Sequence, residues 1–111
     1  KMATSKEYLT FVCTQLAGIR GVDHKGMFGE YLIYVNDKPV LQICDNTVFV
    51  KKHPALAELM ADAPVGLPYE GAKEHYILDV ENRTLAARVI EILERVTPVS
   101  KRCAQKTYGI R

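Results

Sequence analysis

Side chains capable of catalysis or metal binding are few in this sequence, and their spacing does not form a site. The three histidines, His24, His53 and His75, are too far apart in sequence for any two to have the i, i+4 or i, i+2 spacing that presents two imidazoles to one metal. Ser5 and Ser100 lie outside any Gly-x-Ser-x-Gly nucleophile motif, and neither a dinucleotide-binding nor a phosphate-binding glycine motif occurs. We therefore expect no catalytic residue, no metal and no cofactor, and a protein that is not an enzyme.

The cysteines indicate a reducing compartment. Cys13, Cys44 and Cys103 are an odd set without a Cys-x-x-Cys pair, whereas disulfide frameworks use paired cysteines in secreted chains. Cys13 lies in a helical pattern and Cys44 in a strand pattern, where cysteine packs as a small apolar residue. No secretory signal is visible and no apolar run approaches the roughly 18 residues of a membrane span. The expected location is the cytoplasm, without membrane contact.

Two short segments carry more chemistry than packing requires. In residues 25–31, glycines flank Met27-Phe28 and allow bends that present this apolar pair at a sheet edge; a bulge whose Phe28 fills the core is the alternative. Residues 68–73 form a loop that begins at a proline and suits either recognition or simple connection. The candidate binding residues are Lys25, Met27, Phe28, Glu30, Tyr69, Glu70 and Lys73.

Periodicity and turn residues predict the elements that would position these segments. Thr4 and Glu7 form a capping box before a helical pattern that ends near Gly18. Asn36-Asp37 and Asp45-Asn46 separate strand-like runs, and links this short join antiparallel strands. Expected strands cover residues 22–28, 30–35, 40–44, 47–51 and 75–80, and further helices cover residues 55–61 and 82–96.

The predicted fold class is α+β: a mainly antiparallel sheet of four to five strands, a meander plus a late strand, with helices at both ends. The order is helix, four strands, helix, strand, helix. The length of 111 residues fits one domain, and 48% hydrophobic with 25% charged residues is the composition of a globular protein. We place the domain at residues 1–97 and expect residues 98–111 to be a flexible basic tail.

Charge is distributed unevenly between these two parts. Four of the 15 basic residues and none of the 13 acidic residues lie in 98–111, so residues 1–97 hold 11 basic against 13 acidic side chains. Specific DNA binders gather basic side chains on one folded face to neutralise phosphates. The body of this chain, with a charge of −2, is therefore expected not to bind DNA in a sequence-specific way.

The order of the motifs resembles a known family. Met27-Phe28-Gly29, the tyrosine-containing strand after it, a strand that ends at Asp45 and an aromatic strand that ends at Lys51 resemble the N-terminal domain family of TfoX/Sxy, the bacterial competence regulators. Residues 68–73 are similar to a segment common in one branch of that family. The resemblance covers residues 5–96, although Glu30 stands where many members have glycine. The C-terminal helical domain of the full-length regulators has no counterpart in this sequence, which resembles the N-terminal domain standing alone.

The resemblance implies a non-enzymatic regulatory or interaction domain that acts through contacts with another protein, such as a transcription factor or regulator. The alternative is a small-ligand or nucleotide-binding domain with a cleft between residues 27–31 and 69–73. The oligomeric state stays open between monomer and homodimer. Exposed edge strands favour pairing, whereas Lys38, Pro39, Lys51 and Lys52 are of types that block it.

Overall fold

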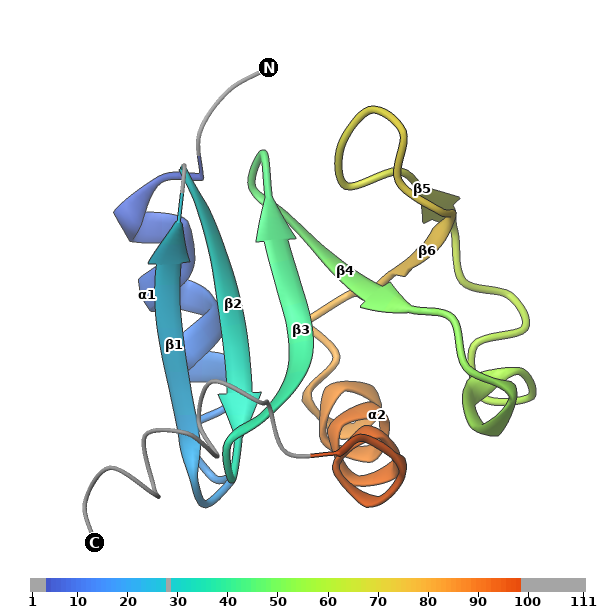
Figure 1. Cartoon of the computed structure of the whole chain (residues 1–111). Helices are drawn as coiled ribbons and strands as arrows, with labels where there is room; N and C mark the ends of the chain where they lie inside the picture. The colour runs from blue at the N-terminus through green and yellow to red at the C-terminus, as the bar shows by residue number, and fades with distance from the viewer. Residues whose placement is uncertain (1–3, 28, 99–111) are drawn as a thin grey trace, which may run out of the picture.

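The computed structural model describes residues 4–27 and 29–98 (Figure 1). The elements follow in the order α1 (Lys6–Gln15), β1 (Val22–Met27), β2 (Glu30–Val35), β3 (Lys38–Cys44), β4 (Thr47–Lys51), η1 (Pro54–Leu56), β5 (Val65–Gly66), β6 (His75–Ile77) and α2 (Arg83–Val96). The α+β class is thereby confirmed, with a helix at each end of an antiparallel sheet.

The six strands form one sheet in the order β1-β2-β3-β4-β6-β5, and every pairing is antiparallel. Two hairpins turn on Asn36-Asp37 and Asp45-Asn46, whose φ angles lie between 52° and 67°. Tight two-residue turns need this left-handed backbone, which Asn and Asp tolerate better than other non-glycine residues. The turn chemistry of the sequence therefore predicted both hairpins correctly.

Several boundaries differ from the sequence-based expectation. The segment expected as a helix over 55–61 is the short 3₁₀ helix η1 followed by turns, because so few residues do not sustain an α-helix on their own. β5 has only two residues, too few to show alternation, and was expected to be loop. α1 ends at Gln15 rather than near Gly18, and β6 ends at Ile77 rather than at residue 80.

The helix cap is also shifted by one residue. Ser5, not Thr4, caps α1, since its Oγ accepts a hydrogen bond from the Tyr8 amide at 3.1 Å. Thr4 is buried and its amide donates to the Gly29 carbonyl at 2.9 Å, while its Oγ1 accepts from the Asn46 amide at 3.3 Å. Thr4 thus joins the ends of two hairpins, a role that only tertiary packing gives it.

Both helices cover the same face of the sheet. Leu9, Val12 and Leu16 of α1 share one hydrophobic core with four side chains of α2, Ala86, Val89, Ile90 and Leu93. The sheet contributes mainly alternate residues to this core, namely Ile33, Val35, Leu41, Ile43, Val48 and Val50, and adds Val40 where the pairing of β2 with β3 is irregular. Because strand side chains alternate between faces, the intervening residues point to the opposite face, which we call the open face.

Candidate functional site

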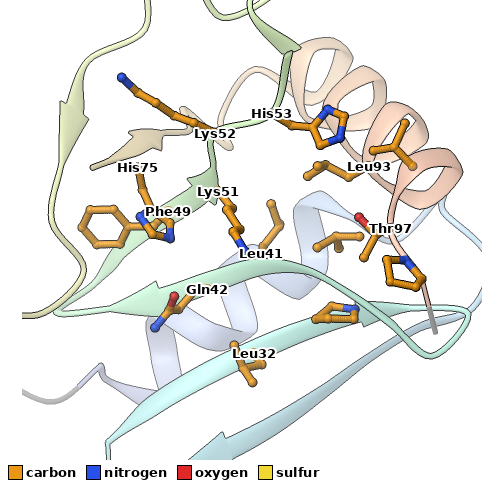
Figure 2. A pocket seen from close by; sticks show the side chains of 14 residues that line it. Leu32, Leu41, Gln42, Phe49, Lys51, Lys52, His53, His75, Leu93 and Thr97 are labelled. Carbon is orange, nitrogen blue, oxygen red and sulfur yellow. The ribbon is translucent and has the colours of Figure 1, made fainter. Parts of the chain in front are cut away.

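A groove lies beside the C-terminal end of α2, with residues of the open face as its floor (Figure 2). Its volume is about 550 Å³. Leu32, Gln42 and Phe49 cross its floor as a row of direct neighbours, since Leu32 pairs with Gln42 and Gln42 with Phe49. Leu93, Val96 and Pro98 add an apolar wall from the last turn of α2 and the residues after it.

Basic side chains gather along one side of this groove. Lys51, Lys52, His53 and His75 belong to its lining, and none of the described lining residues is acidic. Lys51 pairs with His75 across β4 and β6, so these two side chains share the open face. In Figure 2 the Lys51 side chain reaches over the floor toward Leu41 and Gln42. The groove therefore combines an apolar floor with a positively charged rim.

Lys52 is already engaged elsewhere. Its Nζ lies 2.6 Å from Oε1 of Glu74 and 5.4 Å from the centre of the Tyr76 ring, and its side chain points away from the groove floor (Figure 2). The hydrogen bond to Glu74 raises the pKa of the Lys52 ammonium above its ordinary value. In contrast, neither ion pair found among the described residues involves Lys51.

Local hydrogen bonds orient the two histidines of the rim. His53 Nδ1 accepts from the Ala55 amide at 3.0 Å and so caps η1, which leaves the hydrogen of the neutral ring on Nε2. His75 Nδ1 lies 2.7 Å from the carbonyl oxygen of Lys73, which only accepts, so Nδ1 carries the hydrogen there. The rings of His75 and Phe49 lie edge to face, with 6.4 Å between their centroids. The neutral His53 ring is thus the donor at Nε2, and the neutral His75 ring the acceptor.

Two of the candidate residues from the sequence lie on the same face as the groove. Lys25 is exposed and pairs with Leu32, so it belongs to the open face. Glu30 accepts a hydrogen bond from Nε2 of Gln42 at 3.4 Å, beside the groove floor. Met27 is the last residue of β1, and Phe28 lies outside the described residues.

Tyr69, Glu70 and Lys73 lie in the loop between β5 and β6, where all three are exposed. β3 and β4 separate this edge of the sheet from β1 and β2, as Figure 1 shows. The described residues of 27–31 and 69–73 therefore do not form the expected common cleft. The expectation failed because β6 inserts between β4 and β5 and carries the second loop to the far edge. Binding by the individual residues stays a prediction.

The groove residues that sequence analysis missed are Lys51, His53 and His75. The histidines were weighed by their spacing along the chain, whereas the structure joins them through the pairing of β4 with β6. One signal was available, because Lys51 follows Val50 in an alternating strand and must face away from the core. Its neighbour on that face, 24 positions further along, could not be read from local sequence.

Metal and thiol chemistry find no support in the described part of the chain. Within residues 4–27 and 29–98, no group of three or more His, Cys, Asp or Glu side chains is placed to hold a metal ion, and no helix is long and apolar enough to cross a membrane. Cys13 is half-buried and Cys44 is buried. Burial raises the pKa of the Cys13 thiol, which disfavours the reactive thiolate.

The chain is a small α+β domain with a groove beside the end of α2. No protein-family model matches the chain. Over 108 residues it is 33% identical to a protein of Spirochaeta aurantia described as an uncharacterized 12.7 kDa protein in the trpE 5′ region. The match covers 96% of this chain and 94% of that protein, and the chain belongs to its family.

Proposed function

We propose that this protein is a non-enzymatic regulatory or interaction domain, similar to the N-terminal domain of the TfoX/Sxy regulators, that acts by contacting another protein in the bacterial cytoplasm. The observation that carries the proposal is a set of three exposed apolar side chains, close together in sequence, at one edge of the sheet. Val65, Leu67 and Tyr69 are 43%, 56% and 47% exposed and lie within five residues of one another. Exposed apolar side chains that form a contiguous surface mark interaction sites, and their closeness in sequence at this edge favours such a surface.

The geometry of this edge suits presentation of side chains. Pro68 is fully buried between the exposed Leu67 and Tyr69, so it anchors the loop while its neighbours face solvent. β5 pairs with β6 on one side and is the last strand of the sheet. We infer a partner with an apolar contact surface, and we expect that partner to be a transcription regulator.

A photo-crosslinking experiment in the native cells tests this proposal. A photoreactive phenylalanine analogue replaces Leu67 in one variant and Phe11, which is 36% exposed on α1, in the matched control. We expect a specific adduct with a transcription regulator at position 67 only, and its loss when Tyr69→Ser is added. Equal adducts from both positions, or none at position 67, would refute the proposal.

A second candidate function is small-ligand binding, and the groove of the open face favours it. A volume of about 550 Å³ lies within the range of roughly 300–1,000 Å³ that is usual for ligand pockets. The lining is mainly apolar with a few polar groups, which is the usual composition of such sites. This site replaces the cleft that the sequence suggested between residues 27–31 and 69–73.

A further inference from the structure

The apolar part of the groove is formed by elements far apart in the chain. Leu32 and Phe49 of the sheet floor line the groove together with Leu93 and Val96 at the end of α2. Val96 is 37% exposed although it belongs to the last turn of an amphipathic helix. An elongated apolar group that filled the groove would cover Val96 and the half-buried Leu32, since Phe49 and Leu93 are already buried in the protein. Removal of this remaining apolar surface from water favours binding.

The charged part of the groove offers a single uncompensated cation. Lys52 forms its ion pair with Glu74, whereas Lys51 extends over the floor without an acidic neighbour among the described lining residues (Figure 2). Gln42, His53 and Thr97 add uncharged hydrogen-bonding groups around it. One lysine beside apolar surface complements a ligand that carries one negative charge.

The type of basic residue also discriminates between anions. No arginine is among the described lining residues, and the fork of an arginine is the usual partner for bidentate binding of phosphate. A phosphate monoester carries up to two negative charges at neutral pH, which one lysine does not balance. A monocarboxylate matches the available charge better.

The C-terminal residues of the chain do not complement this groove. Pro98 lines it, and residues 99–111 that follow contain four basic and no acidic side chains. A basic segment placed against Lys51 would bring like charges together, which is unfavourable. The charge pattern thus favours a separate ligand over the protein's own tail.

We propose that the groove binds a small amphiphilic carboxylate, with its apolar body along Leu32, Phe49 and Val96 and its carboxylate at Nζ of Lys51. This inference rests on the second candidate function, ligand binding in the groove. The ligand class is an apolar chain or ring system with one carboxylate. His53 and Gln42 supply further hydrogen bonds at the rim.

A titration of the ¹⁵N-labelled full chain, followed by amide shifts, tests the ligand class. The probes are decanoate, the neutral 1-decanol, decyl phosphate and a decyltrimethylammonium salt, all below their aggregation concentrations. We expect decanoate to bind most tightly and to shift the amides of Leu32, Gln42, Phe49 and His75. Equal or tighter binding of decanol, decyl phosphate or the cation would overturn the carboxylate assignment, and tighter decyl phosphate would identify a phosphate site instead.

Variants separate charge from packing. Lys51→Met keeps the aliphatic stem and should weaken decanoate about tenfold or more, as expected for a lost charge-assisted hydrogen bond, without weakening decanol. Lys6→Met, at an exposed position on α1, is the matched control and should leave both unchanged. The Val96→Asp variant should bind decanoate more weakly than the Val96→Asn variant, because the two side chains differ in charge but hardly in size. Equal decanoate affinities of Lys51→Met and Lys6→Met, or of Val96→Asp and Val96→Asn, would refute the role of charge. If no probe shifted the amides of the groove residues, ligand binding itself would be refuted.

Discussion

The two faces of the sheet differ in what covers them, although the same strands supply both. On the face covered by the helices, Ile33, Ile43 and Val48 are fully buried and wholly apolar. On the open face the same strands place Leu32, Gln42 and Lys51, a mixture of apolar, polar and charged side chains. The comparison indicates that stability is concentrated on the covered face, which leaves the open face able to vary its chemistry for binding.

The largest expected difference between the faces comes from two adjacent residues of β3. Ile43→Ala should lower the free energy of unfolding by about 2–5 kcal/mol, because it leaves a cavity in the core. Gln42→Ala, one residue earlier on the open face, should cost less than about 1 kcal/mol, since its hydrogen bond to Glu30 is long and partly exposed. Urea unfolding with a constant m-value measures both. Similar losses would contradict the division between the faces.

The next effect concerns the helix that covers β3. Oδ1 of Asn82 accepts a hydrogen bond from the Leu85 amide at 3.1 Å and caps α2. Asn82→Ala should therefore cost about 1 kcal/mol of stability. Asn82→Asp keeps the acceptor and serves as the control. Thermal unfolding that shows equal losses in the two variants would mean that the cap contributes nothing.

A smaller effect is expected where the covering helix meets the end of β3. Lys38 Nζ donates to the Glu94 carbonyl at 2.8 Å, near the C-terminus of α2, where a positive charge complements the helix dipole. Lys38→Met should cost about 0.3–1 kcal/mol at low salt. The loss in melting temperature should shrink in 1 M salt, because salt screens the charge. A loss independent of salt would indicate packing of the aliphatic stem as the cause.

The smallest effect is expected for the exposed pair of Lys52 and Glu74. The hydrogen bond to Glu74 raises the pKa of Lys52, so any stabilisation is present below the ordinary lysine pKa and disappears as the pH rises through the raised value. Glu74→Gln should lower this pKa toward the ordinary value, as an NMR titration of the Lys52 side chain would measure. The unfolding midpoint at pH 7 should hardly change, because water screens an exposed pair. A large change would show that this rim contributes to folding.

Local sequence predicted most elements because their signals are local. The bounds of β2 and β4 agree with the structure, as does the helix that begins after Asn82 and ends at Val96. The sequence-based expectation was wrong where contacts with residues distant in the chain determine the local structure. Thr4 has the right chemistry for a cap, yet it bonds to Ile43 and Asn46 instead, and Ser5 caps α1.

The candidate site was predicted only in part. Lys25 and Glu30 do lie on the open face beside Leu32 and Gln42, but residues 69–73 lie at the other edge of the sheet. The sequence predicted one late strand after the meander and a loop where β5 lies, so it did not show that the late strand pairs with β4 and with β5. Because β6 lies between them, His75 joins Lys51 and the loop before it moves to the edge.

The sequence by itself determined the two terminal helices, the hairpins and the alternation that separates Val50 from Lys51, because caps, turn residues and periodicity act over a few neighbouring residues. Only the tertiary structure decided that Lys51, His53 and His75 surround one groove with the end of α2. That arrangement depends on the pairing of β4 with β6 and on the packing of α2 below the sheet. Contacts between segments distant along the chain create it, and no local pattern records them.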